Sequence, residues 1–325
     1  MIDNNADLKI TAWAKEILEF KNYQFLNSKI IVSTPWSTVI AIYTKDEIFY
    51  LKQMPKLIAL EARIIKILRE RFYASIPIII DCNDQLNCFL MKNSGTSLRT
   101  ILKNKFDSEL LCKAIEQFTL LQRSVEDHVD IFLNIGVPDW RLNKLTNLYK
   151  EVISQKDLLL ADGLSEIEIS ALENLTPKVA DLAQQLASYT IKETIVQPDF
   201  SDNNTLIDPQ SKNITIIDLG EISISHPFFS LLNCLQQIQK HYGFNKKDPV
   251  YIEVQQAYLK NYMNFDHSQN IMDAFDIASK LWPVYGVLAI YRLVKVCDKE
   301  KLALFQHGKL SKTLREFKDL ICKKL

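Results

Sequence analysis

The apolar residues of this chain change their spacing once, near Asn93-Ser94-Gly95, and this change constrains the fold more than any other feature. Before it, short β-prone runs alternate with polar or proline-bearing breaks, which predicts an antiparallel meander. After it, apolar residues recur at helical spacing over long stretches. The expected strands of the first part are residues 29–33, 38–43, 47–52, 76–80 and 87–91.

Helical patterns accompany the first part and dominate the second, which is interrupted by one short β segment at 205–218. The expected helices are residues 11–22, 56–71, 97–103, 107–125, 139–154, 165–189, 228–240, 247–263, 270–294 and 309–323. We therefore expect an α+β fold of two lobes. We expect residues 1–92 to form a β-rich lobe with a small antiparallel sheet and one main helix. Residues 93–325 form a large, mostly helical lobe that contains a short β-hairpin.

The charge balance and the apolar segments argue against two broad classes of partner. Thirty-nine basic residues against 39 acidic ones give a net charge of zero, which argues against a nucleic-acid binder. The N-terminal residues lack the apolar core of a signal peptide. Residues 281–291 are too few to span a membrane and contain Pro283, so we expect a buried helix and no membrane partner.

Cysteine and glycine usage limits the kinds of site that the chain can form. The six cysteines are scattered without a C-x-x-C pair, so neither a zinc site nor a disulfide framework is expected. They are typical of reduced thiols in a cytoplasmic protein. Only 7 of the 325 residues are glycine, and no G-x-G-x-x-G or Walker-type loop is present. A phosphate site in this chain must therefore be built in another way.

The β interruption brings acidic and amide side chains together. Two β-prone runs at 205–208 and 214–217 enclose turn residues, so Asn204 and Asp218 meet at the open end of a hairpin. An amide oxygen beside a carboxylate suits Mg²⁺, which prefers oxygen ligands. Asp199 precedes Asn204 on the entering loop and is placed to accept a proton from an attacking hydroxyl. The alternative is an acidic hairpin with solvated ends, because Asp and Asn are common in loops.

The motif D-x-x-x-x-N, a short hairpin and then apolar-apolar-Asp resembles the catalytic loop and metal-binding segment of the protein-kinase-like fold. The stretch from Gln197 to Asn204, QPDFSDNN, is similar to the H-G-D-x-x-x-x-N loop of the aminoglycoside phosphotransferase and choline kinase branch. The resemblance implies that Asp199 is the catalytic base and that Asn204 and Asp218 bind the metal ion. It also implies ATP or GTP and Mg²⁺ as cofactors.

Three positions depart from the pattern of this branch. Gln197 replaces the expected histidine, Pro198 replaces the glycine, and Ser230 stands where a structural aspartate is usual. The histidine mainly braces the loop in this fold, and a glutamine side chain can also form hydrogen bonds. At Ser230 we expect weaker support for the catalytic loop.

A lysine and a glutamate in the first lobe are expected to form an ion pair. In the run EIFYLK, alternation places Lys52 on one strand face with Ile48 and Tyr50. On the following helix, Glu61 falls on an apolar stripe. A buried charge needs a partner, so we expect Lys52 and Glu61 to pair, and the resemblance implies that Lys52 then reaches ATP phosphates. The alternative is that Lys52 extends to solvent and Glu61 marks the helix edge.

The resemblance assigns a phosphate-covering role to the loop at 33–38. This loop has no glycine, but hydroxyl and main-chain N–H groups can also bind phosphate. The residues expected to contact phosphate are Ser33, Thr34, Ser37 and Thr38. The alternative is an ordinary tight turn with Trp36 packed on the lobe. Met91, Lys92 and Asn93 match the hinge of the fold, whose main-chain groups read the adenine edge.

Seven residues of the helical lobe are candidates for the acceptor site: Asp202, Glu221, Asp273, Asp276, Trp282, Tyr285 and Tyr291. A carboxylate cluster or an aromatic wall would suit a cationic acceptor such as an amino sugar or choline. The alternatives are a solvated helix face for the acids and ordinary core packing for the aromatic residues.

Two functions therefore stay open on the sequence alone. The first is transfer of the γ-phosphoryl group of ATP to a hydroxyl of a small molecule, with Asp199 as the base. The second is a kinase-like binding module with weak or no catalysis, a pseudokinase, which the three departures and the missing glycines suggest. Phosphorylation of a protein is disfavoured, because too few residues separate Asp218 from the next helix to form a peptide-binding segment. We infer no protein partner.

Overall fold

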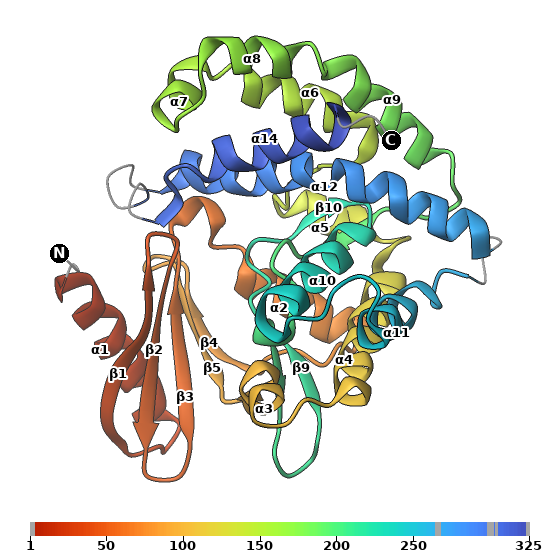
Figure 1. The fold of residues 1–325 in the computed structure, drawn as a ribbon. Coiled ribbons are helices and arrows are strands. Elements are labelled where there is room, and N and C mark those ends of the chain that lie inside the picture. The colour runs from red at the N-terminus through yellow and green to blue at the C-terminus, as the bar shows by residue number, and fades with distance from the viewer. Residues whose placement is uncertain (1–3, 264–267, 298–301, 303–304, 323–325) are drawn as a thin grey trace. The chain divides into compact units, whose positions relative to one another are not determined.

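The computed structural model of the chain describes residues 4–263, 268–297, 302 and 305–322. These residues fold as two compact units, each assembled from separate parts of the chain (Figure 1). The first unit comprises Met1–Thr96, Leu206–Gly220 and Val296–Phe305, and the second comprises Ser97–Thr205, Glu221–Lys295 and Gln306–Leu325. The functional lobes expected at 1–92 and 93–325 stay a prediction.

A five-stranded antiparallel sheet forms most of the first unit, in the order β1-β2-β3-β5-β4. Its strands are β1 (Phe25–Thr34), β2 (Ser37–Thr44), β3 (Ile48–Gln53), β4 (Ile79–Asn83) and β5 (Cys88–Lys92). The expected meander is confirmed for β1, β2 and β3. The two later strands extend the same sheet, with β5 against β3.

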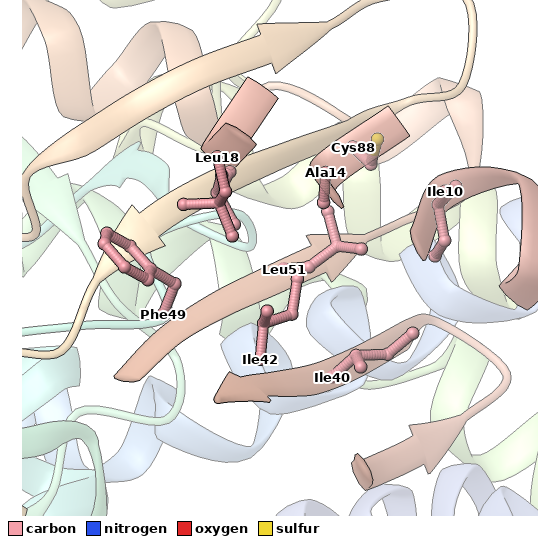
Figure 2. Packing of buried hydrophobic residues seen from close by; sticks show 9 residues of the cluster. Ile10, Ala14, Leu18, Ile40, Ile42, Phe49, Leu51 and Cys88 are labelled. Atoms are coloured by element: carbon pink, nitrogen blue, oxygen red, sulfur yellow. The ribbon is translucent and has the colours of Figure 1, made fainter. Parts of the chain in front are cut away.

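Helix α1 (Asn4–Phe20) covers one face of this sheet. Its apolar residues recur every four positions and so lie on one stripe. The sheet residues beneath them alternate along each strand, which places them on a common face. Figure 2 shows this core, formed by Ile10, Ala14, Leu18, Ile40, Ile42, Phe49, Leu51, Cys88 and Leu90.

The first unit also contains a second helix and part of a second, smaller sheet. Helix α2 (Glu61–Phe72) begins five residues later than the expected helix 56–71, after a short 3-10 turn. The strands β8 (Thr205–Ile207) and β9 (Ile214–Ile216) form a three-stranded sheet with β6 (Thr96–Ser97). The hairpin expected at 205–218 is therefore confirmed, although residues 206–220 belong to the first unit and not to the mainly helical one.

The second unit is mainly helical, as expected, although one expected helix is divided, two are shorter, and the short helices α5 and α7 were not expected. Its described helices are α3 (Leu98–Asn104), α4 (Ser108–Val125), α5 (Val129–Asn134), α6 (Leu142–Ile153), α7 (Lys156–Ala161), α8 (Glu166–Glu173), α9 (Thr176–Ala187), α10 (Phe228–Tyr242), α11 (Pro249–Leu259), α12 (Ser268–Val296) and α14 (Lys309–Cys322). The expected helix 165–189 is divided into α8 and α9, because Pro177 lies in the first turn of α9, where its missing N–H costs nothing.

The apolar stretch 281–291 lies within α12, as expected. Its residues Leu281, Val284, Tyr285, Leu288 and Tyr291 are buried. Among the described residues, the segment Gln269–Val296 is long and apolar enough to cross a membrane, but half of its most apolar window is buried. This is weak evidence for a span, because the core helix of a soluble protein has the same properties.

The structure contains a small antiparallel sheet that the sequence did not predict. Its first strand leads into the candidate catalytic loop. Strand β7 (Thr194–Val196) pairs with β10 (Ser223–Ser225), and each has only three residues, too few to show a period. Gln122 of α4 donates a hydrogen bond to Ile195 O at 2.8 Å, and Thr194 donates to Gln122 O at 2.7 Å. These bonds fix the strand that leads into residue 197.

Candidate functional site

Two carboxylates of the first unit contact the ammonium group of Lys52. Its Nζ lies 2.5 Å from Glu61 Oε2 and 2.5 Å from Asp218 Oδ1. Lys52 and Glu61 are buried, with side chains 6% and 2% exposed, whereas the Asp218 carboxylate is 41% exposed. The structure thus contains the predicted Lys52–Glu61 pair and adds Asp218 to it. The alternative of a solvent-exposed Lys52 is wrong.

The electrostatics of this cluster keep Lys52 charged. Burial alone would lower the pKa of Lys52, but attraction to Asp218 and Glu61 outweighs burial and raises it above its ordinary value. Burial also raises the pKa of Glu61, and the adjacent Lys52 ammonium opposes that shift. The result is a cation fixed between a buried carboxylate and a partly exposed one.

The segment after β9 wraps around Glu61. Asp218 has φ 62°, in the left-handed region that non-glycine residues adopt only a few per cent of the time. The next residue, Leu219, donates its main-chain N–H to Glu61 Oε1 at 3.0 Å. A Cβ on Gly220 would lie 3.0 Å from Met54 Sδ and 3.1 Å from Glu61 Oε2, so a larger residue would require these side chains to shift. A strained backbone held by such contacts is common at functional sites.

The candidate catalytic loop belongs to the second unit and is held by its own amide. Asn204 Nδ2 donates to Asp199 O at 2.9 Å and to Asp199 Oδ2 at 3.0 Å. Asn204 is buried and Asp199 is exposed. Because the amide nitrogen is turned toward Asp199, the amide oxygen points away from it, which suits a metal ligand. The two residues are therefore brought together as the motif predicted.

Helix α10 holds this loop, and here the expectation for Ser230 needs correction. Ser230 Oγ accepts the N–H of Gln197 at 3.0 Å and donates to Gln197 O at 3.2 Å. One turn later, Asn233 Nδ2 donates to Phe200 O at 3.1 Å. The Phe200 ring stacks on Phe118, with centroids 3.9 Å apart. The serine therefore replaces an aspartate without leaving the loop unsupported.

The structure also corrects the expectation of a loop at residues 33–38. The strands β1 and β2 continue to Thr34 and from Ser37, so the turn consists only of Pro35 and Trp36. Thr34 Oγ1 accepts the N–H of Ser37 at 3.0 Å and donates to its carbonyl at 3.1 Å. Trp36 packs edge-to-face on Phe305, with centroids 5.8 Å apart. The hydroxyl-bearing residues Ser33, Thr34, Ser37 and Thr38 thus lie in strands, and the turn matches the tight-turn alternative.

The predicted hinge follows the last strand of the sheet. Met91 and Lys92 end β5, and the N–H groups of Lys92 and Asn93 already donate to the carbonyls of Ile78 and Ile48. Asn93 Oδ1 accepts the N–H of Gly95 at 3.0 Å. A main-chain donor for a base edge would therefore come after Asn93. 

Gly95 is required by a close approach to the hairpin. It has φ +115°, and a Cβ there would lie 2.2 Å from Ile207 O. No side chain larger than hydrogen fits without displacing that strand.

The acceptor candidates are dispersed. Asp202 is buried and paired with Arg99, with 2.7 Å between Asp202 Oδ1 and Arg99 Nη2, so it cannot face an acceptor. Tyr285 and Tyr291 are buried core residues, as the alternative reading held. Asp273 accepts a hydrogen bond from Gln269 on the helix surface. The remaining candidates are Glu221, which is partly buried, Asp276, which is exposed, and Trp282, which lines a cavity.

That cavity has a volume of about 510 Å³ and lies among α10, α11, α12 and α14. Leu232, Leu235 and Gln239 line it from α10. Ser230, which holds the loop, projects from the opposite side of the same helix, because it lies about half a turn around the helix axis from Leu232 and Gln239. Helix α10 thus lies between the cavity and the loop that Ser230 holds.

Comparison with known proteins finds a likeness in structure but none in sequence. No protein-family model matches the chain, and no curated protein sequence matches it. Among solved structures, a mutant of aminoglycoside 2'-phosphotransferase-IIIa in complex with GDP is similar, with a TM-score of 0.59 and 15% identity over 96% of this chain and 97% of that chain. An ethanolamine kinase from Plasmodium vivax has a TM-score of 0.61 and 11% identity, over 95% of this chain and 88% of that one.

An amicoumacin kinase in complex with AMP-PNP and Ca²⁺ is also similar, with a TM-score of 0.59 and 12% identity over 96% of this chain and 95% of that chain. At these identities the likeness concerns the fold. The chain has the protein-kinase-like fold found in small-molecule phosphotransferases, which confirms the resemblance and the fold class expected from the sequence.

Proposed function

We propose that the protein is a small-molecule kinase, which transfers the γ-phosphoryl group of ATP or GTP, with Mg²⁺, to a hydroxyl group of its acceptor. The observation that carries the proposal is the buried Lys52 held between Glu61 and the left-handed Asp218. A purely structural ion pair has no need of a second, partly exposed carboxylate on a strained backbone.

Each charged residue has a distinct role in this proposal. Lys52, oriented by Glu61, places its ammonium against the phosphates and stabilises the charge that develops during transfer. Asp199 accepts the proton of the acceptor hydroxyl and orients its oxygen for attack. Asn204 holds the Asp199 carboxylate through its amide nitrogen. The proton moves from the acceptor hydroxyl to Asp199 as the acceptor oxygen bonds to the γ-phosphorus and the bond to the β-phosphate oxygen breaks, which releases ADP or GDP.

The side chains fit a hard divalent cation. Among the residues that the structure describes, no three His, Cys, Asp or Glu side chains gather into a metal cluster. A cation held by few protein ligands and completed by water and phosphate oxygens is typical of Mg²⁺ in phosphotransfer. Asn204 and Asp218 would hold it, and its charge would offset that of the phosphates.

The nucleotide and the acceptor are proposed as classes of compound and not as single compounds. The structural neighbours include a GDP complex and an AMP-PNP complex, so both ATP and GTP stay open. Main-chain groups at Met91 to Asn93 and just after are proposed to receive the base. An amino sugar, a choline-like compound or a related alcohol is proposed as the acceptor, by analogy with those neighbours. We further propose a cytoplasmic protein, because the six cysteines are scattered along the sequence without the spacing of a disulfide framework.

One observation favours a second function, a kinase-like binding module without efficient transfer. The turn between β1 and β2 has two residues, and the Thr34 hydroxyl bonds to both the main-chain N–H and the carbonyl of Ser37. Such a turn offers fewer unused donors to a phosphate than an open loop does. If this reading is right, the nucleotide binds weakly and no acceptor is phosphorylated efficiently.

Thermal stability with and without Mg-ATP separates these readings. At a nucleotide concentration of 100 Kd, binding should stabilise the native chain by about 2.7 kcal/mol. Asp218→Ala should lose most of this shift, whereas Asp46→Ala, at an exposed turn of the same sheet, should keep it. Absence of any shift with ATP or GTP in the native chain would exclude both the kinase and the nucleotide-binding module.

A panel of hydroxyl compounds then tests transfer itself. Asp199→Asn should bind Mg-ATP as the native chain does but lose transfer by a factor of about 10²–10⁴, as expected for loss of a general base. Transfer at a near-native rate in this variant would show that Asp199 is not the base. Binding without turnover on any acceptor would favour the second function.

A further inference from the structure

Asp202 is a buried carboxylate that the proposed chemistry does not use, although it lies between Asp199 and Asn204. Its side chain is 2% exposed. Arg99 of α3 donates to Asp202 Oδ1 from Nε at 3.1 Å and from Nη2 at 2.7 Å. The hydroxyl of Tyr242, at the end of α10, donates to the other oxygen, Oδ2.

This arrangement satisfies the carboxylate on both sides. Taking an ion out of water costs several kcal/mol, and only good geometry with further hydrogen bonds repays it. Arg99 supplies the charge and two donors, and Tyr242 supplies a neutral donor. Burial and the bond to Asp202 raise the pKa of Tyr242, which keeps its hydroxyl proton in place. Gln237 of α10 accepts from Arg99 Nη2 at 3.3 Å and so fixes the guanidinium.

Asp202 is also the first residue of the 3-10 turn that presents the expected metal ligand. This turn is Asp202–Asn204, and both of its end residues are buried. Within so short a turn, a shift of the first residue moves the last. Ser230 and Asn233 hold the loop before the turn, and the Asp202 contacts are the corresponding anchor within it.

We propose that Arg99 and Tyr242 are positioning residues that act through Asp202 to preset the Asn204 amide for a divalent cation. The inference rests on the proposed function for the role of Asn204, but the ordering of the loop can be measured without it. Arg99 lies four residues after Gly95, so the same contact ties the start of α3 to the catalytic loop.

Hydrogen exchange of the nucleotide-free protein tests the ordering. Tyr242→Phe removes one hydroxyl and keeps the ring that packs on Phe106. It should speed amide exchange in residues 199–205 by about tenfold, and Arg99→Lys, which keeps the charge but loses the fork, should do the same. The control is Tyr149→Phe, which removes a buried hydroxyl bonded to Leu172 O on α6 and α8. The control should leave exchange in this segment unchanged.

A Mg²⁺ titration in the presence of saturating AMP-PNP tests the consequence. In Tyr242→Phe and Arg99→Lys, the Mg²⁺ concentration that gives half of the thermal shift should rise by about 10–100-fold, as for other residues that orient a metal ligand. Tyr149→Phe should lower the melting temperature without altering this concentration. Equal melting losses in all three variants, with unchanged exchange and Mg²⁺ dependence, would overturn the inference.

The two proposals can fail separately. If native protein shows no nucleotide-dependent shift, the proposed function fails, and the exchange rates alone decide whether Arg99 and Tyr242 order the loop. If nucleotide binds but exchange in residues 199–205 is unaffected by either variant, the positioning inference is wrong and the proposed function stands.

Discussion

Removal of the Lys52 ammonium should cost far more stability than removal of its buried partner. Lys52→Met keeps most of the apolar stem but leaves the Glu61 carboxylate, 2% exposed, without a cation. Breaking a buried pair in this way typically costs about 3–5 kcal/mol. The deficit should shrink as the pH is lowered, because burial raises the pKa of Glu61 and protonation removes the unpaired charge.

Glu61→Gln should cost less, about 1–2 kcal/mol, because Lys52 keeps Asp218 as a partner. The glutamine oxygen can still accept the Leu219 N–H. The Asp218 carboxylate is 41% exposed, so its attraction to Lys52 is partly screened and does not make up the whole loss. In the double variant neither charge remains, and its cost should fall at least about 2 kcal/mol below the sum of the single costs.

Urea unfolding at neutral pH, followed by far-ultraviolet circular dichroism, measures all four free energies of unfolding. Single costs that add to within about 0.5 kcal/mol would refute the reasoning, because the two charges would then not interact in the folded protein. A larger cost for Glu61→Gln than for Lys52→Met would refute the assigned asymmetry.

Two further predictions concern the same fold. Gly220→Ala should destabilise the protein by about 1–3 kcal/mol and weaken the Mg-ATP thermal shift, because the new Cβ presses on Glu61. Gly286→Ala, whose Cβ meets only an ordinary contact at 3.6 Å, is the matched control, and equal melting losses would contradict the prediction. Burial lowers the pKa of His226 to about 3 from 6.5. The unfolded chain therefore takes up this proton first as the pH falls below 6.5, so stability declines between pH 6.5 and 3, by about 1.4 kcal/mol at pH 5.5. His226→Asn should flatten this decline in urea midpoints, and an unchanged slope would contradict it.

Local periodicity, together with the family resemblance, predicted the charged pair of the first unit. Lys52 and Glu61 each stand on a strand or helix whose face can be read from neighbouring residues. The hairpin beside Asp218 was equally accessible, since β-prone runs flank turn-forming residues. None of these required knowledge of distant contacts, which explains why the fold class and the pair were both predictable.

The contacts that hold the catalytic loop could not be predicted, because they join segments far apart in the chain. The Ser230 hydroxyl forms a hydrogen bond with Gln197, which is 33 residues away in the sequence, and Arg99 donates to Asp202, which is 103 residues away. A sequence pattern shows only that Ser230 is not an aspartate. The turn at Pro35 and Trp36 matches the tight-turn alternative, whereas the family resemblance favoured a longer loop at 33–38.

The departures from the family motif do not carry equal weight for activity. The serine at 230 and the glutamine at 197 change the side chains, but the main chain of residue 197 is still fixed by two hydrogen bonds to α10. The closed turn at Pro35 and Trp36 has no comparable substitute for the N–H groups that a glycine-rich loop would supply to a phosphate. If this protein is less active than other kinases, we therefore expect the loss in its affinity for the nucleotide. The KM for the nucleotide should be high, whereas the rate of transfer in the bound complex should be less affected. A pseudokinase that had lost its catalytic loop would show the reverse, with tight nucleotide binding and no transfer.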